Sequence, residues 1–297
     1  MSGRHPTADV RDVIAAHLPG HRIRSVVELG SGLDNVAYEV DGELVVRFSR
    51  EPDPVVRAAL VEREARLLAA VAEVCPVPVP EPVFTAPEQG CLGYARLPGV
   101  PLAELPRQQW SAHGTSIAAV LGGLLDALQT TPVERWAGLV DVDDQPSAEW
   151  LGEAAEYYRS VAGHVPVAHR RAVAAFLDSP PPDAGRGLVF SHNDLGIEHV
   201  LVDPAGWTVT GVIDWSDAAL VDPAYDFGLV YRDLGPDALR AALGRCRRDA
   251  ADIAALAERA VFYARCSVFE DLAYGVETGR DGYVGRCHAA MRWLFPA

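Results

Sequence analysis

The sequence predicts an α+β protein with two lobes, a small β-rich lobe followed by a larger helical one. Short stretches of alternating or continuous apolar residues, separated by glycine turns, crowd into the first hundred residues. Helical periodicity dominates from about residue 115 onward. A proline- and glycine-containing segment, Leu97–Leu102, lies where the pattern changes. We therefore expect an N-terminal lobe over residues 1–97 and a C-terminal lobe over residues 98–297.

The N-terminal lobe is expected to contain a glycine turn, a hairpin and one long helix. Gly30, Ser31 and Gly32 interrupt the strand pattern of residues 26–40, and Asp41-Gly42 is typical of a two-residue hairpin turn. In chain order we expect a helix over 9–18, strands within 26–40 and over 44–48, a helix from Asp53-Pro54 to about 74, and strands at 83–84 and 91–97.

The long helix carries an acid on its apolar stripe. Leu60, Leu67, Leu68 and Val71 form this stripe, and Glu64 falls on it. A carboxylate on a buried helix face needs a partner, and Arg47 on the preceding strand is the nearest candidate.

The C-terminal lobe is expected to be helical apart from a small β patch. The patterns predict helices over 115–129, 147–162, 168–177, 237–243, 249–266 and 267–276, with strands near 188–190, 200–203 and 207–213.

Composition excludes several classes of protein. The 297 residues carry a net charge of −15, which argues against nucleic acid as the main partner. No apolar run is long enough to span a membrane, and the N-terminus does not resemble a signal peptide. Five scattered cysteines form no CxxC pair, so we expect reduced thiols, no zinc site and a cytoplasmic location. The oligomeric state stays open.

The loop Ser191–Leu201 is the most informative segment of the chain. Asp194 stands in this polar loop, the potential metal ligand His199 follows it five residues later, and Asp214 ends a nearby apolar strand. Phosphoryl transfer from a nucleotide uses one carboxylate to orient a hydroxyl nucleophile and others to hold magnesium.

The spacing of these motifs resembles that of a known family. His192-Asn193-Asp194 followed by His199, then Ile213-Asp214-Trp215, then the D-P-x-x-D segment 222–226 are together similar to the aminoglycoside phosphotransferase family. The resemblance covers the chain from about Val26 onward. It implies a bilobal protein-kinase-like fold and a small-molecule kinase that uses ATP or GTP with Mg²⁺.

The resemblance also implies roles for single residues. Asp194 would be the catalytic aspartate, His192 would brace the loop, and Asp214 would bind magnesium. Asp222 and Asp226 would hold the loop to its lobe. The nucleotide would be bound by residues of the N-terminal lobe: Gly30, Ser31 and Gly32 at the phosphates, the Arg47–Glu64 pair, the backbones of Ala95 and Leu97 at the base, and Tyr94 beside the pocket.

The chain departs from the family pattern at Asn35, which stands in place of the third glycine of the kinase loop, and at two positions that matter more. It contains no lysine, and Arg47 stands where the family has its phosphate-binding lysine. His199 replaces an asparagine, although magnesium prefers oxygen ligands. Histidine also occurs at this position in macrolide phosphotransferases and in some aminoglycoside phosphotransferases with an H-N-D loop, so it points to those branches.

The acceptor is expected to be a cationic small molecule bound by acids of the C-terminal lobe. Glu198 and Asp217 flank the loop and the strand-end acid, and Glu270, Asp271 and Glu277 lie among aromatic residues near the C-terminus. By resemblance the acceptor is an aminoglycoside first and a macrolide second, and phosphorylation would confer resistance.

Other functions stay open at this stage. Related kinases act on choline-like or sugar metabolites. A catalytically silent nucleotide-binding regulator would fit the Arg47 and His199 departures. A metal hydrolase built on His192, Asp194 and His199 would leave Arg47, Glu64 and the glycine turn unexplained.

Overall fold

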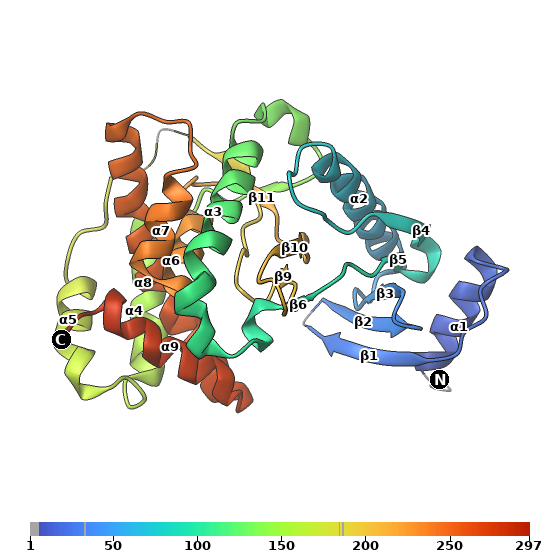
Figure 1. Cartoon of the computed structure of the whole chain (residues 1–297), viewed down its shortest axis with the longest axis horizontal. Helices are drawn as coiled ribbons and strands as arrows, with labels where there is room; N and C mark the ends of the chain where they lie inside the picture. Colours follow the sequence, from blue (N-terminus) through green and yellow to red (C-terminus); the bar gives the residue numbers. More distant parts are fainter. Residues whose placement is uncertain (1–5, 33, 184, 186) are drawn as a thin grey trace. The chain divides into compact units, whose positions relative to one another are not determined.

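The computed structural model describes residues 6–32, 34–183, 185 and 187–297, and it contains two compact units (Figure 1). The N-terminal unit comprises Met1–Pro98 together with Thr210–Ser216, and the C-terminal unit comprises Gly99–Val209 and Asp217–Ala297. The segment that carries Asp214 therefore belongs with the N-terminal unit, although it lies far along the chain.

The N-terminal unit is built on one antiparallel sheet with strand order β1-β2-β3-β5-β4. Its elements are α1 (Pro6–His17), β1 (Val26–Ser31), β2 (Asn35–Val40), β3 (Leu44–Ser49), α2 (Pro54–Ala72), β4 (Pro82–Ala86), the 3₁₀ helix η1 (Pro87–Gln89) and β5 (Cys91–Ala95). β3 and β5, which carry Arg47 and Tyr94, are both interior strands of this sheet.

Two local predictions for this unit are confirmed. Asp41 and Gly42 both have positive φ values, 57° and 75°, as the mirror-image hairpin turn between β2 and β3 requires. The Asp53 side chain caps α2 by accepting hydrogen bonds from the backbone N–H groups of Val55 and Val56.

The predicted apolar stripe of α2 was partly wrong. Leu67, Leu68 and Val71 are buried, but Leu60 is 36% exposed and Val61 is buried in its place. Val61 and Leu68 are seven residues apart, about two helical turns, and lie on the buried face of α2. Leu60 precedes Val61 by one residue, so its side chain points about 100° away from that face.

The C-terminal unit is mainly helical, and α3, α6, α7 and α8 lie side by side in it (Figure 1). Its helices are α3 (Trp110–Gln129), α4 (Ser147–Val161), α5 (Arg170–Leu177), α6 (Tyr225–Leu234), α7 (Pro236–Leu243), α8 (Ala250–Thr278) and α9 (Asp281–Leu294), and its 3₁₀ helices are η2 (Leu102–Glu104), η3 (Arg107–Gln109), η4 (Val133–Trp136) and η5 (Val167–His169). No helix within the described ranges combines the length and the apolar character that crossing a membrane requires.

Three of these helices differ from the sequence prediction. α8 is continuous where two helices were predicted, because no glycine or proline interrupts the chain around Cys266 and Ser267. α6 and α9 were not predicted. α6 carries a glycine, Gly228, in its interior, and α9 carries Gly282 and Gly285, and glycine weakens a helical pattern.

Short strands position the polar loop. The strands are β6 (Val100–Pro101), β7 (Asp141–Val142), β8 (Val189–Ser191), β9 (Val200–Val202), β11 (Ala219–Val221) and, at the boundary of the two units, β10 (Val209–Val212). β8 pairs with β11, and β9 pairs with β6. The loop 192–199 therefore has a paired strand at each end.

Candidate active site

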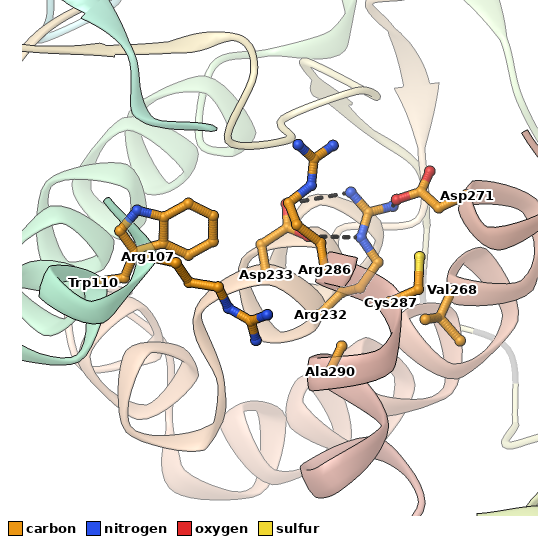
Figure 2. A pocket seen from close by; sticks show the side chains of 9 residues that line it. All are labelled: Arg107, Trp110, Arg232, Asp233, Val268, Asp271, Arg286, Cys287 and Ala290. Carbon is orange, nitrogen blue, oxygen red and sulfur yellow. Dashed lines mark hydrogen bonds and ion pairs between the residues drawn. The ribbon is translucent and has the colours of Figure 1, made fainter. Parts of the chain in front are cut away.

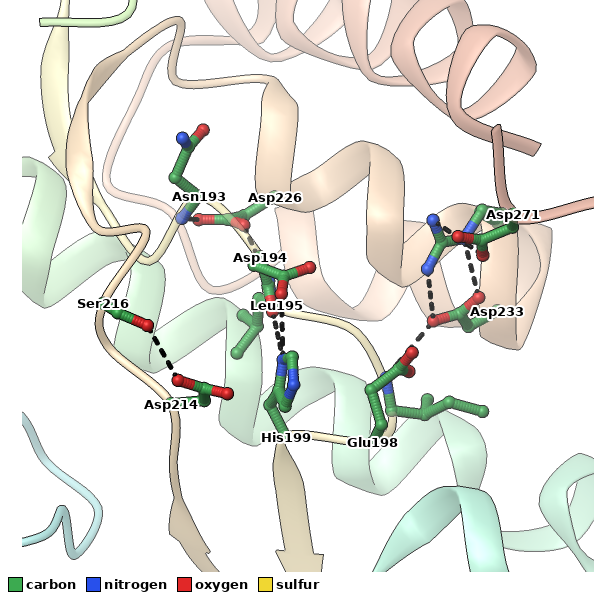
Figure 3. A network of polar contacts seen from close by, with 12 residues as sticks. Asn193, Asp194, Leu195, Glu198, His199, Asp214, Ser216, Asp226, Asp233 and Asp271 are labelled. Atoms are coloured by element: carbon green, nitrogen blue, oxygen red, sulfur yellow. Dashed lines mark hydrogen bonds and ion pairs between the residues drawn. The ribbon is translucent and has the colours of Figure 1, made fainter. Parts of the chain in front are cut away.

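The loop 192–199 folds tightly around Asp194 (Figure 3). The backbone carbonyl of Asp194 accepts hydrogen bonds from Gly196 N–H at 2.8 Å and from His199 Nδ1 at 2.8 Å. The same His199 nitrogen lies 3.3 Å from the Asp194 carboxylate. His199 thus fixes the direction of the Asp194 side chain, 44% of which stays exposed to solvent.

Asp226, in the first turn of α6, anchors the loop through hydrogen bonds. Its carboxylate is fully buried and accepts the Ser191 hydroxyl and the backbone N–H groups of Asn193 (3.0 Å) and Leu195 (3.1 Å). Asn193 takes a left-handed conformation with φ of 63°, which turns the chain sharply before Asp194. His192 is fully buried and stacks on His199, as a residue that braces the loop would.

The surroundings of Asp194 hold the pKa of its carboxyl group above the usual value. Burial by the surrounding protein raises the pKa of Asp194 to about 7, His199 opposes the rise, and Glu198 and Asp217 add to it. A group with a pKa near the working pH is suited to accept a proton in catalysis.

Arg47 in the N-terminal unit joins three groups with one guanidinium. Its Nη1 lies 2.7 Å from Glu64 of α2, and its Nη2 lies 3.3 Å from Asp214 and donates to the Ser216 hydroxyl at 3.1 Å. Burial raises the pKa of Glu64, Arg47 opposes this rise, and Asp214 adds to it. The predicted Arg47–Glu64 pair is therefore present, and Asp214 is a third member that the pattern did not reveal.

The Asp214 carboxylate has the chemistry expected of a magnesium ligand. It follows β10 in a left-handed conformation (φ 62°), accepts the Ser216 hydroxyl at 2.9 Å, and its side chain is 41% exposed. Magnesium is usually held by one or two carboxylates together with substrate phosphates. Among the described residues no three His, Cys, Asp or Glu side chains gather into a dedicated metal site.

His199 fits the same ion less well. Its ring nitrogen Nδ1 is already directed at the Asp194 carbonyl, and its other donor is also nitrogen, a poor ligand for magnesium. Its assignment as a metal ligand stays a prediction.

Gly30 and Gly32 lie between β1 and β2, where the nucleotide phosphates are predicted to bind. Neither glycine has a positive φ, and among the described residues an added Cβ would meet no atom within 4 Å at Gly30 and only the Asn35 carbonyl, at 3.9 Å, at Gly32. The described neighbours therefore do not require glycine at either position, and the phosphate-binding role of the turn stays a prediction.

The residues predicted for the nucleotide base lie at the end of β5. Tyr94 and Ala95 are its last two residues, opposite Val45 and Leu44 of β3, and Leu97 follows next to Gly211. Burial raises the pKa of Tyr94 to about 12, so its hydroxyl stays protonated.

The five predicted acceptor acids divide into two groups. Glu198 and Asp271 are paired with arginines: Glu198 lies 3.6 Å from Arg286 and accepts the Tyr283 hydroxyl, and Asp271 lies 3.1 Å from Arg232. Burial opposes the ionisation of Glu198, but Arg232 and Arg286 hold its pKa below the usual value. The other three acids, Asp217, Glu270 and Glu277, have exposed side chains.

Three residues near the predicted acceptor acids, Glu153, Tyr157 and Tyr225, were not predicted from the sequence. Glu270 and Glu277 lie near Tyr157 of α4, as does Glu153, and their charges, led by that of Glu270, raise the pKa of this tyrosine. Burial, followed by the charges of Glu270 and Asp194, raises the pKa of Tyr225. The acidic character of α4 was the available signal, but nothing in its spacing pointed to α8.

The comparisons with known proteins agree with this arrangement. The model of the phosphotransferase enzyme family matches residues 25–261, which is most of the chain. The chain therefore belongs to the phosphotransferase enzyme family, and the resemblance predicted from its motifs is confirmed.

One curated relative is an aminoglycoside phosphotransferase. The aminoglycoside 3'-phosphotransferase of Streptomyces fradiae is 29% identical over 162 residues, 48% of this chain and 52% of the relative. The chain thus matches about half the length of this curated relative.

Solved structures confirm the predicted kinase-like fold class. The GDP and kanamycin complex of APH(2'')-IIia has a TM-score of 0.71 at 22% identity and covers 96% of this chain and 97% of its own. The macrolide 2'-phosphotransferase of Brachybacterium faecium has a TM-score of 0.60 at 25% identity, covering 95% and 97%.

Proposed function

We propose that this protein is a kinase that transfers the γ-phosphate of ATP or GTP to a hydroxyl of a cationic antibiotic, with an aminoglycoside as the first choice. The observation that carries the proposal is the Asp194 carboxylate, partly exposed and oriented by His199 on a loop that Asp226 fixes. Relatives with solved structures bind GDP, ADP or ATP, which supports a nucleotide as the phosphoryl donor.

Asp194 would accept the proton of the acceptor hydroxyl as the oxygen attacks. Its pKa of about 7 leaves a substantial fraction ionised at neutral pH. His199 would hold the carboxylate in one direction, and Asp226 would keep the backbone around it rigid.

Arg47 would provide the positive charge for the nucleotide phosphates. Its guanidinium is always charged and its planar fork matches phosphate oxygens, while Glu64 holds it in place. Bound Mg²⁺ would neutralise charge on the phosphate oxygens, and Asp214 is the residue that would hold it.

The surface around Tyr157 supports a cationic acceptor. This ring is 38% exposed, and three carboxylates, those of Glu153, Glu270 and Glu277, act on it. Aromatic faces and carboxylates together attract ammonium groups. Glu270 also lies within electrostatic range of Tyr225, as Asp194 does, which supports an acceptor held close to the catalytic loop.

The decisive experiment is a transfer assay with ATP and GTP over a panel of aminoglycosides and macrolides. We expect magnesium-dependent phosphorylation of an aminoglycoside, and a loss of about 10²–10⁴-fold in kcat for Asp194→Asn. Asp237→Asn is the matched control, because Asp237 is an exposed aspartate on α7 and its loss should leave kcat unchanged.

The other outcomes separate the alternatives. Transfer that survives Asp194→Asn would contradict the assigned base. Nucleotide binding without turnover on any acceptor would favour a silent regulator, and hydrolysis of phosphate esters without nucleotide would favour a metal hydrolase.

A macrolide is the second candidate acceptor. The similarity to the Brachybacterium faecium macrolide enzyme supports it. So does the pairing of Glu198 and Asp271 with arginines, because those two acids then offer less charge to a polycation.

A further inference from the structure

Helix α6 presents two carboxylates to the catalytic loop, one at each end of the helix. Asp226 is in its first turn and Asp233 in its last, and the two positions share one face because they are two helical turns apart. Asp226 accepts the N–H groups of Asn193 and Leu195, and Asp233 accepts the N–H of Ile197 at 3.2 Å. The two halves of the loop are therefore held by different aspartates.

Asp233 lies in an environment that disfavours an isolated carboxylate. Its side chain is only 6% exposed, and it stands at the C-terminal end of a helix, where the backbone dipole disfavours negative charge. The neighbouring Arg232 compensates with a fork: its Nε donates to Asp233 Oδ1 at 2.9 Å and its Nη2 to Oδ2 at 3.2 Å. Oδ2 of Asp233 thus accepts both the Ile197 N–H and a hydrogen bond from the Arg232 guanidinium.

Arg232 extends this contact to α8. Its Nη1 lies 3.1 Å from Asp271, next to Glu270 in the chain (Figure 2). A small pocket lies against this group, lined by Arg232, Asp233 and Asp271 among others (Figure 2). The contacts run from the loop through Asp233 and Arg232 to the helix that carries a candidate acceptor residue.

The loop geometry makes Ile197 a sensitive point. Ile197 follows Gly196, whose N–H donates to the Asp194 carbonyl, and the N–H of His199 donates to Gly196. Any displacement of Ile197 therefore moves the chain between Asp194 and His199.

We propose that Asp233 is a positioning residue of the catalytic loop and that Arg232 couples it to α8. Asp226 belongs to the motif that identified the family, whereas Asp233 lies outside that motif. The kinetic consequence rests on the proposed function, but the hold on Ile197 does not.

The test combines amide hydrogen exchange with steady-state kinetics for Asp233→Asn. Asparagine keeps the shape, but whichever way its amide is turned, its NH₂ group faces another donor, Ile197 N–H or Arg232. We expect exchange at the Ile197 amide to rise about tenfold or more, while Leu195, held by Asp226, keeps its protection. We expect kcat to fall about 10–100-fold without a change in the KM for nucleotide, as for the loss of a residue that orients a reacting group. Asp237→Asn is again the matched control.

Two results would overturn the proposal in a folded variant. One is unchanged exchange at Ile197, and the other is faster exchange with an unchanged kcat. If the wild-type protein phosphorylates no acceptor, the proposed function fails, and the exchange data alone decide whether Asp233 holds the loop.

A second variant serves if Asp233→Asn does not fold. Arg232→Lys keeps a cation beside Asp233 but loses the fork. Exchange at the Ile197 amide should then rise, and kcat should fall, by a smaller factor, about three- to tenfold. No movement in either readout would also overturn the proposal.

Discussion

Replacing Asp226 by asparagine should destabilise the C-terminal unit strongly, although the two side chains have the same shape. Asp226 uses Oδ2 for the Ser191 hydroxyl and the Asn193 N–H, and Oδ1 for the Leu195 N–H. An asparagine that keeps its oxygen toward Asn193 turns its NH₂ group toward the Leu195 N–H. Two donors then face each other at a site without solvent.

The size of the effect follows from the three contacts. The stranded Leu195 N–H costs about 1–3 kcal/mol, and the other two bonds lose their charge assistance, at about 1 kcal/mol each. The sum is a loss of about 3–5 kcal/mol in the free energy of unfolding of the C-terminal unit. For a unit of this size it corresponds to a Tm lower by about 6–20 °C.

Thermal unfolding followed by tryptophan fluorescence measures this loss, with Asp237→Asn as the control for the same chemical change on the surface. The Trp136 and Trp215 side chains are both buried, and Trp136, in the C-terminal unit, stacks on Phe190 of β8 next to the loop. A Tm for Asp226→Asn within about 2 °C of that of the control, equivalent to less than about 1 kcal/mol, would refute the reasoning.

Two further predictions concern the arginine-linked carboxylates. Arg47→Lys keeps the charge beside Glu64 but loses the second nitrogen that reaches Asp214. Nucleotide binding measured by calorimetry should therefore weaken about tenfold, the contribution of one charge-assisted hydrogen bond. Arg66→Lys, on the exposed side of α2, is the control, and an Arg47→Lys variant that binds nucleotide as tightly as this control would contradict the role of the fork. Burial raises the pKa of Asp271 to about 7, from a value near 4 in the unfolded chain. As the pH rises from about 4 to 7, the unfolded state loses this proton while the folded state keeps it. The free energy of unfolding should therefore fall over this range, by up to about 1.4 kcal/mol per pH unit. Asp271→Asn should remove this slope from the dependence of Tm on pH, and an unchanged slope would contradict the assignment.

The residues proposed for catalysis could be recognised from the sequence because they fall into short motifs. Asp194 and His199 lie in one loop, and the carboxylate of Asp226, from the first turn of α6, accepts the N–H groups of Asn193 and Leu195 in the same loop. The Arg47–Glu64 pair could be predicted from helical phase, since a carboxylate on the apolar face of α2 needs a cation.

Contacts between distant segments could not be predicted in the same way. The segment with Asp214 belongs to the N-terminal unit although most of its sequence neighbours do not, and no periodicity indicates that assignment. Asp271 is predicted to contact the acceptor because it stands among other acids, and that prediction does not reveal its arginine partner. Its partner Arg232 lies on α6, a helix that the sequence pattern did not reveal.

The lack of lysine takes on a physical meaning once these contacts are known. Arg47 joins Glu64 to Asp214, and Arg232 joins Asp233 to Asp271, in each case with separate nitrogen atoms of one guanidinium. An ammonium group offers one nitrogen atom, so a lysine could not make the two contacts with separate nitrogens of a planar fork. At these two positions the fork itself is used. The same property makes Arg→Lys a non-conservative change at both positions, and it predicts that the two variants described above alter nucleotide affinity and loop protection separately.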